Sequence, residues 1–432
     1  MFFNRPESGS KALLVHIQKH DSELASTEEL KELVISAGFA VSGCLSSKRR
    51  YPHPGTFIGG GKIDEIKAFL RNKACDLLVF GDDLSPTQER NLEQILGKRV
   101  LGRTGLILEI FARRARTHEG KLQVELAQLD HVSSRLVRGW SHLDRQKGGS
   151  GRAAGASSGL AGAGETQLEA DQRMISERIK RINDRLLKVK AQRAHNRRGR
   201  SRSDVKTISL AGYTNAGKST LFNQLCASDV LTEDQLFATL DPTLRKLELP
   251  IIGRAVLADT VGFIRQLPHS LVDSFRATLE EVSQADLILH VVDSASFLRA
   301  EQISEVNAVL EEIGAEATPR LMVYNKIDLI NEAPRIERDF KGVVERVWVS
   351  SIDGAGKDLL LEAIAERVGE AIVETNITVQ PQQGRLRAQL FDLGAVVEEN
   401  PCEDGSIEMR LRIQKSSLKK IRQKNLWNQS SF

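Results

Sequence analysis

The first 118 residues alternate short apolar runs with segments whose apolar residues have helical spacing. The runs LLVHI (13–17), FAVSGCL (39–45) and DLLVF (76–80) are typical of buried strands. Residues 23–37 and 63–71 have the spacing of helices, and Pro86 stands near the start of another, where proline is favoured. Strands that alternate with helices predict a small sheet with crossover connections. We therefore expect an N-terminal α/β domain over residues 1–118.

Residues 119–204 have a different, heptad-like pattern. One apolar seam is Leu122, Leu126, Leu129 and Leu136, and a second is Leu168, Ile175, Ile179, Ile182, Leu186 and Val189. Thr166 and Glu169 match a T-x-x-E capping box, which predicts where the second helix begins. Residues 148–164, between the seams, are rich in Gly, Ala and Ser. We expect an antiparallel helical hairpin with a flexible tip and a second helix about 45 Å long. A pair of ordinary core helices is the alternative.

Residues 205–373 return to strand–loop–helix alternation. The predicted strands are 205–211, 256–261, 287–293, 321–325 and 347–351. The tail, residues 374–432, contains RLRAQLF (385–391), then SIEMRLRI (406–413), then a short basic helix from Ser416. This pattern indicates a small C-terminal α+β domain.

Composition narrows the class of protein. The chain has 432 residues, 41% hydrophobic and 27% charged, an ordinary globular mixture that excludes a disordered or fibrous protein. No run of about 18 apolar residues predicts a membrane span, and the N-terminus lacks the apolar region of an export signal. The four cysteines are far apart, which disfavours disulfides and a zinc ribbon. We expect a cytoplasmic enzyme or switch that does not bind membranes.

The net charge of +4 hides an uneven distribution. Residues 188–202 contain seven basic residues and no acid, and residues 410–432 contain seven more, again without an acid. Basic charge gathered in two stretches of an otherwise acidic chain favours contact with a polyanion such as nucleic acid. The alternative is a pair of solvated helix faces with a polar linker.

A phosphate-binding motif follows directly after the strand that ends near Ala211. It is Gly212, Tyr213, Thr214, Asn215, Ala216, Gly217, Lys218 and Ser219, which is GxxxxGKS. Backbone N–H groups of such a loop and of the helix that follows can surround phosphate oxygens. Lys218 should reach the β- and γ-phosphates, and Ser219 should be a ligand of Mg²⁺. A structural glycine turn is disfavoured, because further elements of the same site follow in order.

These further elements are three motifs, each after a predicted strand. They are DxxG (Asp259, Thr260, Val261, Gly262), NKxD (Asn325, Lys326, Ile327, Asp328) and the pair Ser350 and Ser351. Asp259 can hold Mg²⁺ through water, and the Gly262 amide can sense the γ-phosphate. The Asp328 carboxylate can accept hydrogen bonds from N1–H and the 2-amino group of guanine, which adenine lacks. Asn325 fixes the loop, the Lys326 stem can lie along the ring, and Ser350 or Ser351 can donate an amide to guanine O6.

The segment Phe237, Ala238, Thr239, Leu240 and Asp241, followed by Pro242 and Thr243, lies between GxxxxGKS and DxxG. It should be switch I, whose threonine closes on Mg²⁺ and the γ-phosphate. We favour Thr239, with Thr243 as the alternative, and either could instead be a turn residue beside Pro242. The expected Mg²⁺ ligands are therefore Ser219, Thr239 and Asp259, and the expected catalytic groups are Lys218, Thr239 and Gly262. The order of motifs predicts a P-loop GTPase domain that uses GTP, GDP and Mg²⁺.

Two positions qualify this prediction. Phe263 follows DxxG, where Ras-like GTPases have a glutamine that orients the attacking water. Since phenylalanine cannot bond to water, intrinsic hydrolysis should be slow and need a partner, another residue or a potassium ion. Gly59-Gly60-Gly61-Lys62 is no second phosphate loop, because Thr56 and Ile63 break the pattern. It is either a tight structural loop or a contact for phosphate or RNA.

The chain resembles the HflX family of ribosome-associated GTPases, in the Obg–HflX group. The resemblance rests on TFIGGGK (56–62), LSPTQERNLE (84–93), RTGLILEIFARRARTHEGKLQVELAQL (103–129), GETQLE (164–169), GYTNAGKSTLFN (212–223), LFATLDPT (236–243) and DTVGFI (259–264). It implies four domains: N-terminal α/β (1–118), helical hairpin with basic linker (119–204), G domain (205–373) and C-terminal α+β (374–432). The family's nucleotide residues carry over to Gly212–Ser219, Thr239, Asp259, Gly262, Asn325 and Asp328.

The resemblance also implies a partner. The large (50S) ribosomal subunit with its 23S rRNA is expected to bind the chain, with the hairpin tip near the peptidyl-transferase region. Splitting or rescue of stalled ribosomes under stress is the implied role, and we expect a monomer. At the tip, Ala161 and Ala163 replace the family's Arg and Pro, and Gly102 replaces an Asp. The alternative function is an RNA-binding assembly or remodelling protein in which GTP only gates binding to rRNA.

Overall fold

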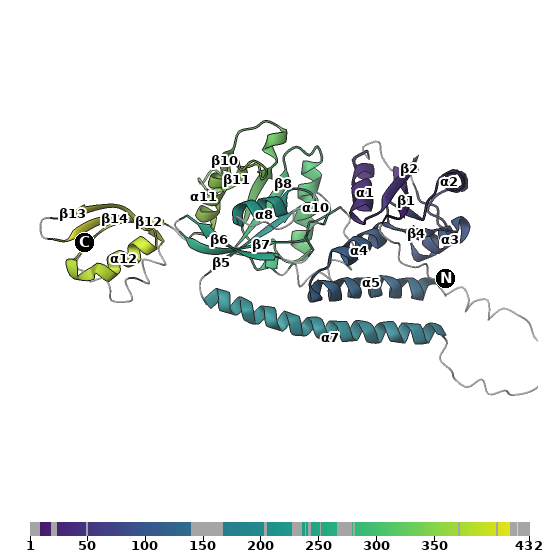
Figure 1. Cartoon of the computed structure of the whole chain (residues 1–432), viewed down its shortest axis with the longest axis horizontal. Helices are drawn as coiled ribbons and strands as arrows, with labels where there is room; N and C mark the ends of the chain where they lie inside the picture. Colours follow the sequence, from purple (N-terminus) through teal and green to yellow (C-terminus); the bar gives the residue numbers. More distant parts are fainter. Residues whose placement is uncertain are drawn as a thin grey trace, which may run out of the picture. The chain divides into compact units, whose positions relative to one another are not determined.

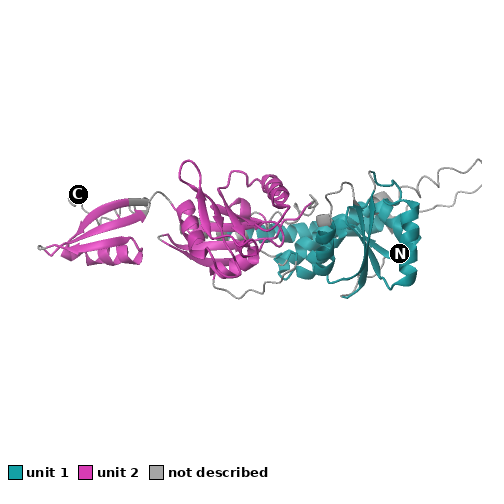
Figure 2. Ribbon diagram, turned by 90° about the horizontal axis from the view of Figure 1, so that it is seen from above, with its two compact units in different colours: residues 1–195, 233–241, 266–277 teal, residues 196–232, 242–265, 278–432 magenta. Residues whose placement is uncertain are grey.

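We analysed a computed structural model of the chain. It describes residues 9–18, 24–48, 51–139, 167–202, 205–226, 236–237, 239–240, 243–250, 252–265, 279, 281–369, 372–402, 405–414 and 421. The chain divides into two compact units, shown in different colours in Figure 2. The first comprises residues 1–195, 233–241 and 266–277, and the second comprises 196–232, 242–265 and 278–432. No helix among the described residues is long and apolar enough to span a bilayer.

The first unit contains a parallel four-stranded sheet in the order β2-β1-β3-β4. Its strands are β1 (Lys11–Gln18), β2 (Ala40–Lys48), β3 (Leu77–Phe80) and β4 (Arg99–Leu101). The helices are α1 (Leu24–Ser36), α2 (Gly60–Asn72), α3 (Pro86–Leu96) and α4 (Arg103–Arg114). All four residues of β3 are buried, as expected for a parallel strand covered on both faces.

Local sequence explains how two of these helices begin. Pro86 is the first residue of α3, and Ser85 before it forms a capping box with Gln88. Gly59 is the N-cap of α2, so Gly60, Gly61 and Lys62 form the first turn of this helix rather than a loop. The Lys62 ammonium lies 2.8 Å from a carboxylate oxygen of Glu65. The four-residue motif thus starts a helix, and its phosphate or RNA contact stays untested.

The helical block forms two antiparallel helices, α5 (His118–Gly139) and α7 (Gln167–Arg202), which lie side by side in Figure 1. Their contact is apolar and combines the predicted heptad positions Leu122, Leu126 and Leu129 of α5 with Ile179, Ile182 and Leu186 of α7. Arg178 bonds to Glu125 beside this seam at 2.7 Å. The predicted tip (148–164) and Thr166 of the capping box lie outside the described residues.

An ion pair between a partly exposed arginine and a buried carboxyl group joins α5 to the sheet domain. The guanidinium of Arg135 on α5 contacts one carboxylate oxygen, Oε2, of Glu89 on α3. Glu89 is only 3% exposed, and its other oxygen has no hydrogen-bond partner in the described part of the chain. Burial raises the pKa of this carboxyl from 4.5 to about 7, against the opposing effect of Arg135.

The second unit contains a seven-stranded sheet in the order β10-β11-β9-β8-β5-β7-β6. Its strands are β5 (Lys206–Gly212), β6 (Thr243–Leu249), β7 (Gly253–Asp259), β8 (Leu287–Asp293), β9 (Arg320–Asn325), β10 (Arg335–Arg338) and β11 (Val344–Trp348). The edge pairs β6–β7 and β10–β11 are antiparallel, and the inner pairs are parallel. The helices include α8 (Lys218–Cys226), α10 (Arg299–Glu312) and α11 (Lys357–Val368).

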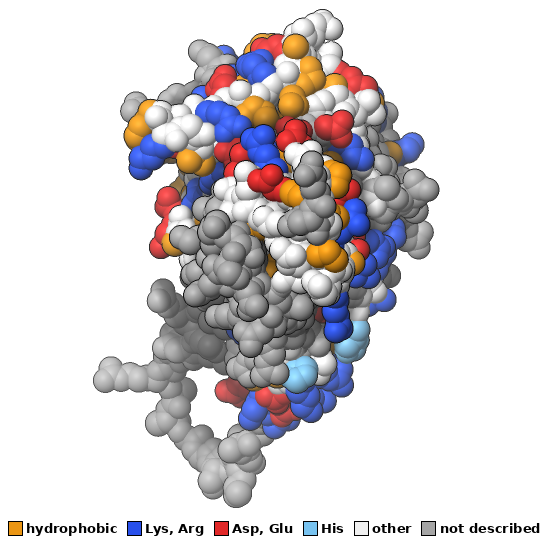
Figure 3. Space-filling view, turned by 90° about the vertical axis from the view of Figure 1, so that its left-hand side faces the viewer, with side chains coloured by type: hydrophobic (Ala, Val, Ile, Leu, Met, Phe, Trp, Pro, Cys, Tyr) orange, Lys and Arg blue, Asp and Glu red, His pale blue; other side chains and the backbone are white. Residues whose placement is uncertain are grey.

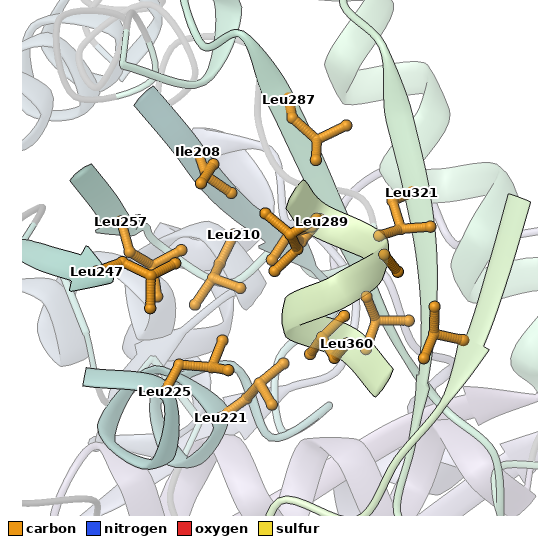
Figure 4. Packing of buried hydrophobic residues seen from close by; sticks show 14 of the residues in the cluster. Ile208, Leu210, Leu221, Leu225, Leu247, Leu257, Leu287, Leu289, Leu321 and Leu360 are labelled. Atoms are coloured by element: carbon orange, nitrogen blue, oxygen red, sulfur yellow. The ribbon is translucent and has the colours of Figure 1, made fainter. Parts of the chain in front are cut away.

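The main core of this unit lies between the sheet and two helices. Leu210 and Leu289 of the central strands pack against Leu221 of α8 and Leu360 of α11, all fully buried (Figure 4). Parallel strands deliver their carboxyl ends to one edge of a sheet, where ligands of open α/β folds bind. The core therefore fixes the edge that carries the four nucleotide motifs.

The C-terminal part is a three-stranded antiparallel sheet in the order β12-β14-β13. Its elements are β12 (Ile372–Val379), a 3₁₀ turn (Pro381–Gln383), α12 (Gly384–Asp392), β13 (Val396–Pro401) and β14 (Ile407–Gln414). RLRAQLF lies in α12, whose Leu386 and Leu390 join the buried cluster on the sheet. Arg410, one of the basic tail residues, pairs with Glu374 at 3.3 Å. On the face seen in Figure 3, basic and acidic side chains are intermixed.

The structure confirms the expected fold class, an α/β P-loop domain combined with an N-terminal α/β region, a helical hairpin and a small α+β region. The boundaries of the four domains stay a prediction.

Glu89 gives the first unit a defined pH dependence. A carboxyl group whose pKa is higher in the folded chain stabilises the fold fully below pH 4.5, and this contribution is lost as the pH rises through about 7. The shift is worth roughly 3 kcal/mol. We expect Glu89→Gln to remove this dependence, measured as hydrogen-exchange protection of α3 and α5 between pH 5 and 8. The parent and the variant are compared at each pH, so that the effects of other titrating groups on stability cancel. His131 is such a group, because burial lowers its pKa to about 4. If the protection of the parent and of the variant changed in the same way with pH, Glu89 would not be the source of the pH dependence.

Candidate nucleotide site

The GxxxxGKS motif spans the turn between β5, which ends at Gly212, and α8, which begins at Lys218. A Cβ on Gly212 would lie 2.3 Å from the carbonyl oxygen of Val291 on β8, so this position has no room for a side chain. Gly217 has φ +88°, and a Cβ there would lie 2.2 Å from Nδ2 of Asn325. Close approach of backbone to neighbouring strands thus requires glycine at both positions.

Lys218 is held inside this loop. Its Nζ donates hydrogen bonds to the carbonyl oxygens of Gly212 at 3.0 Å and Tyr213 at 2.7 Å. Burial lowers the pKa of Lys218 to about 8, and the negative charge of Asp259 opposes this effect. The ammonium is therefore mostly charged at neutral pH and fixed in place to bind phosphate.

Two predicted Mg²⁺ ligands lie together. Ser219 Oγ donates to Oδ2 of Asp259 at 2.9 Å. A hydroxyl and one carboxylate, completed by substrate phosphate and water, are the oxygen ligands that Mg²⁺ prefers. The donor set fits the ion, and Ser219 and Asp259 would hold it. Thr260 next to Asp259 is fully buried, and its hydroxyl donates to the carbonyl oxygen of Leu210 at 2.6 Å, which fixes the end of this strand.

The base-recognition motif is organised by Asn325, which is fully buried. Its Nδ2 donates to the Ala216 carbonyl at 2.9 Å and to Ser351 Oγ at 3.0 Å, and its Oδ1 accepts from the Ser351 amide at 3.0 Å. Asp328 has a buried oxygen, Oδ1, with no hydrogen-bond partner among the described residues. An acceptor left open in this way fits the N1–H and 2-amino donors of guanine.

Ser350 and Ser351 differ from expectation in one respect. The Ser350 amide donates to the Ala355 carbonyl at 2.9 Å, and the Ser351 amide donates to Asn325. Both amides are therefore engaged within the protein, because the loop folds back on itself and on Asn325. We expect guanine O6 to take its hydrogen bond from the next amide along the loop, that of Ile352.

The structure describes three of the predicted switch I residues, Phe237, Thr239 and Leu240, within the first unit. Phe237 has φ +56° and is 2% exposed, and its ring meets Phe111 edge-on with centroids 4.8 Å apart. The amide of Leu236 donates to Ser36 Oγ at 3.0 Å. Ala238 and Asp241 lie outside the described residues. Whether Thr239 or Thr243 binds Mg²⁺ stays a prediction.

Sequence reasoning missed one side chain at the site, Asp293, and did not foresee the contact that the hydroxyl of the predicted residue Tyr213 makes. Asp293, at the end of β8, lies 2.8 Å from Nζ of Lys326 and thereby holds the lysine of NKxD. Tyr213, inside the phosphate loop, accepts a hydrogen bond at its hydroxyl from the Arg265 amide at 2.9 Å. The position of Asp293 at the carboxyl end of a buried strand is a signal that could have found it.

The fold and the site define a P-loop GTPase. Four sequence families match successive parts of the chain: "GTP-binding GTPase N-terminal" (24–112), "GTP-binding GTPase Middle Region" (114–200), "50S ribosome-binding GTPase" (207–326) and "HflX C-terminal domain" (337–429). GTPase HflX of Escherichia coli K12 is 49% identical over 95% of both chains. GTPase HflX of Caldanaerobacter subterraneus is 43% identical over 91% of this chain and 89% of its own. The chain belongs to the HflX family of GTPases.

A solved structure is also similar. The crystal structure of a GTP-binding protein from Sulfolobus solfataricus in complex with GDP is 24% identical, with a TM-score of 0.44, over 83% of this chain and 98% of that one.

The protein thus hydrolyses GTP to GDP and phosphate with Mg²⁺ as its cofactor. We expect the phosphate loop and Lys218 to bind the phosphates, and Asn325 joins this loop to the loop that carries Ser351. When bound, Mg²⁺ supplies positive charge to the phosphate oxygens. We expect Asp328 to select guanine through its open acceptor.

Gly217 tests how closely these loops must pack. Gly217→Ala should weaken the binding of fluorescently labelled GDP by about 10- to 100-fold, because its Cβ displaces the Asn325 amide. Gly253→Ala is the matched control, since Gly253 has a similar φ of +81° but nothing within 4 Å of its Cβ. Gly253→Ala places alanine at a similarly unfavourable φ but causes no steric clash, so this variant should bind GDP like the parent. Equal affinities for all three proteins would refute this role of Gly217.

Proposed function

We propose that the GTP-bound protein binds the large (50S) ribosomal subunit and its 23S rRNA through the helical hairpin and the N-terminal domain. It acts in the cytoplasm as a monomer, splits or rescues stalled ribosomes under stress, and is released after hydrolysis. The name of the family that matches residues 207–326, "50S ribosome-binding GTPase", supports the class of partner.

The observation that carries the proposal is the exposed face of α7. Arg181, Arg185 and Lys188 are exposed and spaced 4 and 3 residues apart, so they share one face of the helix. The 36 residues of α7 extend about 54 Å. The apolar seam occupies another face of this helix. Between residues 173 and 190 six basic side chains are exposed, against two acidic ones, Glu177 and Asp184. The exposed surface of this long helix is therefore net positive, which suits contact with the phosphates of RNA.

Phe263 supports partner-dependent hydrolysis. Its side chain is 1% exposed, and its backbone is bonded to the phosphate loop. The position that orients water in Ras-like GTPases therefore offers no polar group. Slow turnover that is stimulated on the ribosome follows from this arrangement.

The second candidate is an RNA-binding assembly or remodelling protein in which GTP gates binding to rRNA. The same basic face of α7 favours it. A GTP analogue that cannot be hydrolysed separates the two: it supports subunit splitting under the first proposal, and only retention on rRNA under the second.

The basic face can be tested by sedimentation with purified 50S subunits in the presence of a GTP analogue. We expect the double variant Arg185→Ala, Lys188→Ala to bind more weakly, and the slope of log affinity against log salt to fall by about two. The control is Lys246→Ala, Lys341→Ala, which removes the same charge from exposed positions outside both the hairpin and the N-terminal domain. Unchanged binding of the first variant at all salt concentrations would count against docking through α7.

GTP turnover with and without 50S subunits tests the whole proposal. We expect strong stimulation by the subunits, and loss of this stimulation when residues 148–164 are deleted. Stimulation that survives the deletion would move docking to the N-terminal domain and the basic surfaces. Absence of any stimulation would favour the remodelling alternative.

A further inference from the structure

The segment after DxxG is fastened to the start of the phosphate loop. The Phe263 amide donates to the Gly212 carbonyl at 3.1 Å, and the Thr214 amide donates to the Phe263 carbonyl at 2.7 Å. The Tyr213 hydroxyl accepts from the Arg265 amide at 2.9 Å. With its backbone held and its ring buried, Phe263 has no means of contacting the reacting end of GTP. Another group must occupy that end.

The side chain of Thr214 lies beside that end of the site, with its methyl group next to Gly262. A Cβ built on Gly262 would be 2.9 Å from Cγ2 of Thr214 and 3.0 Å from Nζ of Lys218. These three residues therefore surround one small space. In P-loop GTPases the lysine binds the β- and γ-phosphates, and the DxxG glycine lies at the γ-phosphate. Thr214 thus stands at the γ-phosphate end of the site.

The hydroxyl of Thr214 is buried and unused. Thr214 is 6% exposed, and its Oγ1 has no hydrogen-bond partner in the described part of the chain. A buried polar group in this condition destabilises the protein unless a bound molecule completes its hydrogen bonding. Thr260 provides a contrast, because its buried hydroxyl is bonded to the protein. The unused hydroxyl of Thr214 therefore indicates a missing ligand at this end of the site.

We propose that Thr214 is a catalytic residue whose hydroxyl donates a hydrogen bond to a γ-phosphate oxygen, most strongly in the transition state. No bond to Thr214 forms or breaks. Water adds to the γ-phosphorus while the bond to the β–γ bridging oxygen breaks, and the proton of the water ends on the phosphate product. Negative charge is redistributed over the phosphate oxygens during this step, and the fixed dipole of the hydroxyl stabilises it.

The test compares Thr214→Val, which keeps the shape and removes the hydroxyl, with Thr214→Ser, which keeps the hydroxyl. Single-turnover GTP hydrolysis and the binding of labelled GDP, alone and with aluminium fluoride, are measured on the full chain. We expect the valine variant to bind GDP within about twofold of the parent. Its hydrolysis and its aluminium-fluoride-dependent binding should fall by about 10- to 100-fold, as for one hydrogen bond to a charged group. The serine variant should restore most of both.

Thr318→Val is the matched control, since it removes a hydroxyl that bonds to the Ser283 carbonyl elsewhere in the same unit. Thr214→Ala is a second variant without the hydroxyl, in case valine disturbs the loop. The proposal is overturned if the valine and alanine variants bind aluminium fluoride with GDP as the parent does. Equal defects in the serine and valine variants, or loss of GDP binding in both hydroxyl-free variants, would also overturn it and leave Thr214 a structural role.

Discussion

The nucleotide site depends on the hydrogen bonds of one buried amide, that of Asn325. Through three bonds it joins the phosphate loop at Ala216 to the loop that carries Ser351. These loops follow β5 and β11. Asn325 is the last residue of β9, which lies between these two strands in the sheet. Phosphate recognition and base recognition are therefore parts of one bonded assembly. The absence of a side chain at Gly217 is what allows the amide to come so close.

Much of this site could be predicted from sequence because its motifs encode local geometry. Glycine at 212 and 217, the lysine and serine that begin α8, and Asp259 at the end of β7 follow from the order of strand, turn and helix. The apolar seam of the hairpin could also be predicted, because heptad spacing places residues on one face of a helix whatever they pack against.

The parts that sequence could not provide depend on contacts between distant segments. The pairing of Asp293 with Lys326 requires the register of β8 against β9. The use of the Ser351 amide by Asn325 requires β9 and β11 to be neighbours. The contact of Phe237 with Phe111 joins residues more than a hundred positions apart, and no periodic pattern reports such a pair. Neither could spacing reveal that Gly60 and Gly61 begin a helix, since glycine usually interrupts one.

The ion pair between Arg135 and Glu89 has a mechanical consequence. It holds α5 close to its C-terminal end, while the apolar seam that begins at Leu122 holds α7 against the same helix. These two contacts connect the hairpin helices to each other and to the sheet domain. For a rigid helix about 54 Å long, each degree of rotation about one end displaces the other end by about 1 Å. Small rotations of the sheet domain would therefore be converted into displacements of atomic size at the far end of the arm.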